Sequence, residues 1–195
     1  MPLFEVEPMA WQVSDPNAFD ALLLTSANAV RQGGDGFGGL LALPVYAVGE
    51  ATAAAARGAG FEVAGMGDGG VDRLLESVPP GLRLLHLCGE HRTAPQSRPT
   101  TAVPVYRAVE IAAPEGLARI VGQTVAVHSP RAAARLAELA DRAGIGRRAV
   151  RIAAISEAAA LAAGPGWERC AAADQPNEAA LLALAARLCD NPVTT

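Results

Sequence analysis

The sequence predicts an α/β protein made of two similar lobes, each a parallel sheet flanked by helices. Short apolar runs, typical of strands covered on both faces of a parallel sheet, alternate with alanine-rich helical stretches along the chain. Several strand–helix junctions of the first half recur in the second half at a nearly constant spacing. The length of 195 residues suits one ordinary domain or two small ones.

The composition excludes several classes of function. All sixteen basic residues are arginine, and the lack of lysine excludes Schiff-base catalysis and a P-loop. A net charge of −4 without a basic run argues against a nucleic-acid partner. The three cysteines form no C-x-x-C pair, and no apolar run approaches the roughly 18 residues that span a bilayer. We therefore expect a soluble cytoplasmic protein that does not bind membranes.

In the first half, apolar runs bounded by proline and glycine predict five strands. They span residues 3–7, 20–25, 45–48, 60–63 and 82–88. The first alternates apolar and acidic residues, as an edge strand does. Helices are predicted at residues 26–30, 50–59 and 71–78, the last reached through a glycine-containing loop at 65–70. A glycine-rich break is expected at 33–39.

A long alternating segment at 102–109 leads into the second half, and with the first strand it forms an extended two-strand linker. The strands that follow are predicted at 124–128 and 150–155, with a last short strand starting at Gly166 and Trp167. Helices are predicted from Pro114, at 131–143, at 156–163 and at 177–189. We expect one lobe at residues 1–108 and the other at 109–195.

The stretch 45–63 shows the feature that points to a ligand. Gly49 ends a buried strand and a helix follows at once, so unpaired backbone N–H groups and the positive end of the helix dipole face one small volume. Such a volume attracts anions. Similar junctions follow Thr25, His128 and Ile155. If both lobes point the carboxyl ends of their strands into one cleft, four helix N-termini could hold several carboxylates there.

An internal duplication explains the recurrence of these junctions. The matched pairs lie about 105 residues apart, in the same order in both halves. They are Thr25-Ser26 with His128-Ser129, Gly49-Glu50 with Ser156-Glu157, Gly60-Phe61 with Gly166-Trp167, and Leu74-Leu75 with Leu181-Leu182.

Six stretches, which together cover most of the chain, resemble the uroporphyrinogen-III synthase family. They are FDALLLTSANAV (19–30), VYAVGEATAAAARGAGF (45–61), LLHLCGE (84–90), VPVYRAVE (103–110), VAVHSPRAAARL (125–136) and IAAISEAAALAAGPGW (152–167). The resemblance implies a lyase without a cofactor, with its active site in the interlobe cleft. Its substrate would be hydroxymethylbilane, which it dehydrates and cyclises to uroporphyrinogen III with inversion of the terminal pyrrole ring, a step of heme biosynthesis.

The resemblance also implies site residues. Tyr106 matches a tyrosine proposed to assist departure of the substrate hydroxyl, although it could equally be an interdomain packing residue. No metal is expected. The residues that match substrate-binding turns are Thr25, Ser26 and Ala27; Gly49, Glu50, Ala51 and Thr52; Gly89; Ser129, Pro130 and Arg131; and Ser156 with Ala159.

Two departures from the family pattern stand out. Ser156 and Ala159 replace a glycine and a threonine that the family usually carries in the fourth turn. Family members also usually begin with a further strand and helix of the lobe that contains the C-terminus. The second lobe is therefore expected to lack a sheet strand. Four explanations stay open: a monomer, a strand-exchanged dimer, a truncated gene model or an inactive fragment.

Three other interpretations stay open on the residues alone. Gly65-x-Gly67-x-x-Gly70 with Glu90 matches a dinucleotide fingerprint, although a flexible loop before a helix is the favoured interpretation. The H-x-C-x-x-H pattern at 86–91 suggests zinc but lacks a fourth ligand, which favours a buried cysteine and two ordinary histidines. A third alternative is a two-lobed protein that binds a tetrapyrrole or another anion without turnover.

Overall fold

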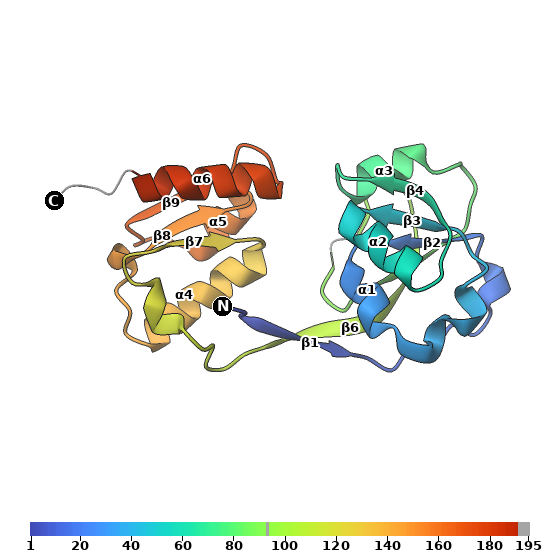
Figure 1. Ribbon diagram of the computed structural model, residues 1–195, viewed down its shortest axis with the longest axis horizontal. Coiled ribbons are helices and arrows are strands. Elements are labelled where there is room, and N and C mark those ends of the chain that lie inside the picture. The colour runs from blue at the N-terminus through green and yellow to red at the C-terminus, as the bar shows by residue number, and fades with distance from the viewer. Residues whose placement is uncertain (93, 191–195) are drawn as a thin grey trace. The chain divides into compact units, whose positions relative to one another are not determined.

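The computed structural model describes residues 1–92 and 94–190 (Figure 1). The chain divides into two compact units. The N-terminal unit is Phe4–Val109, and the C-terminal unit is Met1–Leu3 together with Glu110–Thr195. In the described part of the chain, no helix is both long enough and apolar enough to cross a membrane.

The N-terminal unit is built on a six-stranded sheet with the order β1-β6-β5-β2-β3-β4. The ladders that join β6, β5, β2, β3 and β4 are parallel. The strands are β1 (Phe4–Pro8), β2 (Ala21–Leu24), β3 (Val45–Val48), β4 (Val63–Gly67), β5 (Leu84–Gly89) and β6 (Thr101–Glu110).

Helices cover both faces of this sheet, because alternate side chains of each strand point to opposite sides. Leu22 and Leu24 of β2 pack in one cluster with α1 (Ala27–Gln32) and α2 (Glu50–Gly58). Ala21 and Leu23 pack in another cluster with α3 (Val71–Ser77). All four residues of β2 are buried, which explains why the strand is a continuous apolar run.

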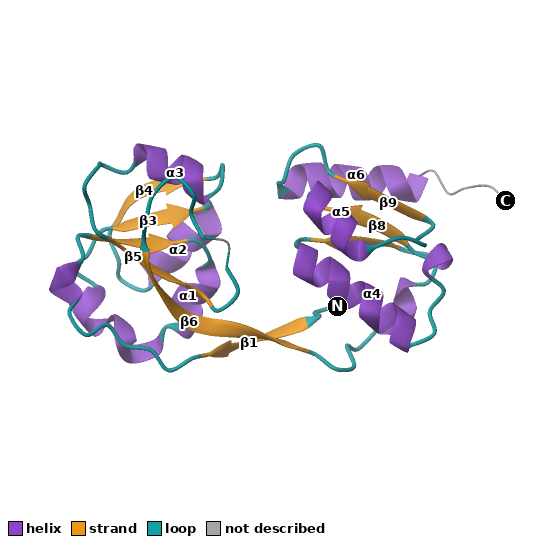
Figure 2. Ribbon diagram, turned by 180° about the vertical axis from the view of Figure 1, so that it is seen from behind, coloured by secondary structure: helices purple, strands orange, loops and turns teal. Residues whose placement is uncertain are grey.

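The C-terminal unit has a parallel sheet with the order β7-β8-β9 in its described residues. The strands are β7 (Thr124–Val127), β8 (Arg151–Ala154) and β9 (Arg169–Ala172). Ile152 and Ala154 pack against α4 (Pro130–Arg142) and α5 (Glu157–Ala163), whereas Ala153 packs against α6 (Glu178–Asp190). Figure 2 shows α6 on the opposite side of this sheet from α4. The predicted α/β class with parallel sheets flanked by helices is confirmed.

Local predictions were wrong in two places, at residues 60–70 and at the start of the last strand. Residues 65–70 are not all loop, because Gly65 and Gly67 lie in β4 and pair with β3. A Cβ atom at Gly65 would lie 2.7 Å from the ring of Tyr46, so close packing explains this glycine. A phosphate-binding turn therefore does not form at the first two glycines of the dinucleotide fingerprint.

The last strand begins at Arg169 instead of Gly166. The Trp167 side chain is buried, and its indole Nε1 donates to the Ala163 carbonyl at 3.0 Å, which ties this segment to α5. The predicted glycine-rich break is confirmed, because α1 ends at Gln32 and a separate 3-10 helix, Gly34–Leu40, follows it. Phe37 of this 3-10 helix packs against the core.

Candidate functional site

A hollow of about 290 Å³ opens in the N-terminal unit where β2, β3 and β5 reach their carboxyl ends. We call it the strand-end hollow. Ligands of open α/β sheets bind at this edge. The predicted site residues that line it are Thr25, Ser26, Gly89 and Tyr106. The remaining lining residues, Val48, Val71, His91 and Arg92, were not predicted.

The first predicted turn brings two hydroxyl groups to the hollow. Ser26 is the N-cap of α1, and its Oγ accepts a hydrogen bond from Asn28 N at 3.2 Å. Thr25 Oγ1 lies 3.0 Å from His86 Nε2 on the neighbouring strand β5. Ala27, the third residue predicted here, is the first residue of α1. Ser26 therefore caps the helix that was predicted to start there, and the Thr25 hydroxyl has a histidine partner that the sequence did not reveal.

The second predicted turn lies next to the hollow but does not line it. Gly49 has φ +80°, which favours glycine, and its N–H donates to the Gly67 carbonyl at 2.8 Å. That amide is therefore paired with β4. Thr52 is buried, and the exposed Glu50 carboxylate accepts a hydrogen bond from Arg57 at 3.1 Å. Ala51 is exposed at the start of α2. Ligand contact by these residues stays a prediction.

Tyr106 reaches the hollow because the β5–β6 ladder changes register. Cys88 pairs with Pro104, but Gly89 pairs with Tyr106, so one extra residue, Val105, is accommodated on β6. An irregularity of this kind changes the direction in which the next side chain points. The tyrosine ring then lies directly over Gly89, where a Cβ atom would be 2.8 Å from Cζ and 3.0 Å from the hydroxyl oxygen. Gly89 is therefore needed for this placement.

Arg92 brings a positive charge to the hollow, whereas the neighbouring buried His86 is uncharged. Burial, followed by the nearby Arg92 charge, lowers the pKa of His86 to about 4, so its ring is neutral at neutral pH. Burial also raises the pKa of the Cys88 thiol, which therefore stays protonated. Arg92 is exposed, and no carboxylate among the described residues forms an ion pair with it. Within the described part of the chain, the hollow thus offers a guanidinium without an ion pair and the hydroxyl-bearing residues Thr25, Ser26 and Tyr106.

The zinc interpretation has no support in the geometry. No group of three or more His, Cys, Asp or Glu residues that could hold a metal ion occurs among the described residues. Cys88 Sγ instead lies 3.6 Å from the Val103 carbonyl, and the exposed His91 lies 3.6 Å from the Glu90 carboxylate.

The other predicted residues lie in the C-terminal unit. Ser129 Oγ caps α4 by accepting a hydrogen bond from Ala132 N at 3.1 Å, and Pro130 and Arg131 are the first two residues of that helix. Ser156 Oγ caps α5 in the same way, 3.3 Å from Ala159 N. The Ala159 side chain is fully buried in the core. Substrate contact by these five residues stays a prediction.

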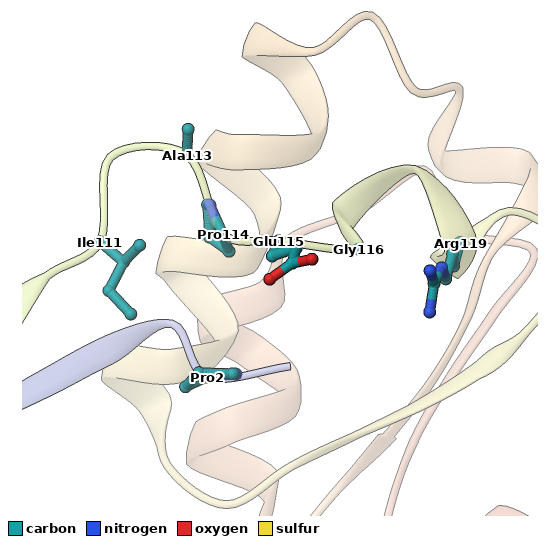
Figure 3. Close-up of a pocket in the computed structure, with 7 residues that line it drawn as sticks. All are labelled: Pro2, Ile111, Ala113, Pro114, Glu115, Gly116 and Arg119. Atoms are coloured by element: carbon teal, nitrogen blue, oxygen red, sulfur yellow. The ribbon is translucent and has the colours of Figure 1, made fainter.

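The C-terminal unit also has a larger hollow, of about 430 Å³ (Figure 3). It is lined by Pro2, Ile111, Ala113, Pro114, Glu115, Gly116 and Arg119. None of the predicted site residues lies in its lining. The strand-end hollow is therefore the stronger candidate, since four of the predicted site residues line it.

Comparison with known proteins gives a consistent result. Residues 1–183 match the family model described as uroporphyrinogen-III synthase HemD. The fold is similar to uroporphyrinogen-III synthetase from Helicobacter pylori, with a TM-score of 0.65, 19% identity, and coverage of 95% of this chain and 91% of that chain. It is also similar to a mutant uroporphyrinogen III synthase from Thermus thermophilus, with a TM-score of 0.52, 18% identity, and coverage of 97% and 88%. No curated protein matches the sequence significantly.

Proposed function

The chain belongs to the uroporphyrinogen-III synthase HemD family, and from this premise we propose that the strand-end hollow binds the reacting end of hydroxymethylbilane. The family consists of lyases of tetrapyrrole and heme biosynthesis. They remove the hydroxyl of hydroxymethylbilane, invert the terminal pyrrole ring and close the macrocycle as uroporphyrinogen III. The placement of Tyr106 over Gly89, beside Thr25 and Arg92, is the observation that carries the proposal.

The chemistry of the reaction explains why such a group of side chains is useful. Departure of hydroxide leaves an electron-rich azafulvene cation, so a hydrogen-bond donor is needed beside the leaving oxygen. The phenol O–H of Tyr106 is such a donor. The substrate also carries acetate and propionate carboxylates, for which hydroxyl groups and a guanidinium are suitable partners. Holding the folded bilane in one geometry is the larger demand, because the unheld bilane closes to the uninverted isomer.

Replacing Tyr106 with phenylalanine is expected to lower kcat by more than about tenfold while leaving KM nearly unchanged, because only the departure step loses a donor. Steady-state kinetics with hydroxymethylbilane measure this. Tyr46→Phe removes the hydroxyl of the only other tyrosine, which is buried in the core, and should leave kcat unchanged. A Tyr106→Phe enzyme with wild-type kcat would remove this hydroxyl from the mechanism.

Arg92 is proposed to bind a substrate carboxylate. Replacing it with glutamine is expected to raise KM about fivefold, the value of one exposed charge pair, with little change in kcat. Because the pair is exposed, the difference from wild type should shrink as the salt concentration rises. Arg31→Gln is the matched control, since Arg31 is exposed in the same unit but does not line the hollow. Equal KM values for the two variants would contradict the role of Arg92.

The isomer of the product tests the function itself. The protein is supplied with freshly generated hydroxymethylbilane, the products are oxidised, and the isomers are separated. An excess of type III over the protein-free control is expected. The alternative, a non-catalytic protein that binds tetrapyrroles, is motivated by Ala159, which stands where the family usually has threonine. Tight binding accompanied by type I product alone would favour that alternative.

Several finer points stay predictions. They are the sharing of one cleft by the two lobes, the roles of the turns in the C-terminal unit, the cytoplasmic location, and the choice between a monomer and a strand-exchanged dimer. Neither the Tyr106 nor the Arg92 experiment depends on them, because both residues lie in the N-terminal unit.

A further inference from the structure

We propose that His86 is a positioning residue that holds the Thr25 hydroxyl as a hydrogen-bond donor toward an anionic group bound in the strand-end hollow. The identity of that group as a substrate carboxylate rests on the proposed function.

The geometry brings the two side chains together from strands that are far apart in sequence. His86 lies within β5 and is 0% exposed. Its Nε2 atom lies 3.0 Å from Oγ1 of Thr25, the residue that directly follows β2. Because β2 and β5 are paired in parallel through Leu24 and Leu87, the spacing between the two side chains is set by the sheet. Thr25 also lines the hollow, so the residue whose hydroxyl contacts the imidazole ring lies beside the ligand space.

The second ring nitrogen of His86 decides the direction of this hydrogen bond. Nδ1 is buried and has no hydrogen-bond partner among the described residues. A neutral imidazole carries one N–H, and placing it on Nδ1 would leave a buried donor without an acceptor. Orphaned buried N–H groups are rarer in proteins than under-satisfied acceptors. The proton therefore belongs on Nε2, which donates to Thr25 Oγ1.

The consequence is that Thr25 keeps its own proton for the ligand. A hydroxyl that accepts from His86 donates to an acceptor in the hollow, such as a carboxylate oxygen. The lowered pKa of His86 is consistent with this, because a neutral ring adds no charge of its own beside the Arg92 guanidinium. The arrangement provides a hydrogen-bond donor for ligand groups that accept hydrogen bonds, such as carboxylates.

Nitrogen NMR of the full chain tests the tautomer without any substrate. Uniformly ¹⁵N-labelled protein at neutral pH should give the imidazole pattern of an Nε2-protonated ring for His86. The other two histidines are identified by the loss of their signals in His91→Gln and His128→Gln. A pattern typical of an Nδ1-protonated ring would overturn the proposal.

Kinetics test whether the hydrogen bond matters for binding. His86→Leu should raise KM for hydroxymethylbilane about fivefold, as expected for loss of one hydrogen bond, with kcat nearly unchanged. His86→Gln keeps an N–H donor at a similar distance along the side chain and should restore KM. Thr25→Val should raise KM as His86→Leu does, and the double variant should show no further increase. A wild-type KM for His86→Leu, or effects that multiply in the double variant, would overturn the proposal.

The two tests separate this proposal from the proposed function. An active synthase with an Nδ1-protonated His86 refutes only the positioning role. A wild-type protein that yields no excess of type III product, yet shows an Nε2-protonated His86, refutes the proposed function and supports the assigned direction of the hydrogen bond.

Discussion

Replacing Gly89 with alanine is expected to lower kcat about a hundredfold, the effect of displacing a catalytic group by roughly 1 Å. The added methyl group would lie 2.8 Å from Tyr106 Cζ, which is closer than side chains approach in folded proteins. The ring must therefore move away from the backbone at the end of β5, and its hydroxyl moves with it. Steady-state kinetics and the ratio of type III to type I product measure the effect.

Gly58→Ala is the matched control for this substitution. Gly58 lies at the end of α2 in the same unit, and a Cβ atom there meets nothing within 4 Å. The kcat of the Gly58→Ala variant should equal that of wild type. Thermal unfolding of both variants separates displacement of the tyrosine from a general loss of stability. A Gly89→Ala protein that keeps wild-type kcat would show that the position of the ring is unimportant for turnover.

His86 is expected to make the protein less stable as the pH falls. Its pKa is about 4 in the folded state, compared with 6.5 as the usual value, so the unfolded state binds a proton first. Above pH 6.5 the ring is neutral in both states and does not affect stability. As the pH falls from 6.5 to 4, the free energy of unfolding should decrease by about 3 kcal/mol from this group alone. Urea unfolding at a series of pH values measures the slope.

Two variants isolate the contribution of His86. His86→Gln cannot titrate, so its stability should change less than that of wild type over the same pH range. His86→Leu also lacks a titratable ring and should show the same smaller change. Parallel stability curves for wild type and His86→Gln would contradict the assignment, since titration of the carboxylates is common to both proteins.

The sequence predicted the strands best where burial is complete. The run at 20–25 contains β2, and the run at 45–48 coincides with β3, because a strand buried on both faces must be apolar at every position. The starts of the helices that follow Ser26, Ser129 and Ser156 were also predicted closely, since each start depends on local residues that include the capping serine.

The failures have tertiary causes. Residues 65–70 resembled a loop because glycine is rare in strands, but the Tyr46 ring occupies the space that a side chain at Gly65 would need. Arg92 lies in the loop that follows β5, and this loop has no periodic pattern of apolar residues from which its path could be predicted. The only local signal was its place three residues after Gly89, at the end of a buried strand. The bond between Thr25 and His86 joins residues 61 positions apart, so neither local sequence reveals it.

Because β6 contains one extra residue, Val105, the orientation of Tyr106 depends on the number of residues that precede it in the strand. Deleting Val105 would let β6 pair evenly with β5, and alternation along the strand would then turn the tyrosine toward the opposite face of the sheet. A related chain could thus keep this tyrosine in its sequence and still lack the phenol at the hollow. To decide whether a related chain places the phenol at the hollow, the number of residues that β6 contains before the tyrosine must be compared, as well as the identity of the residues.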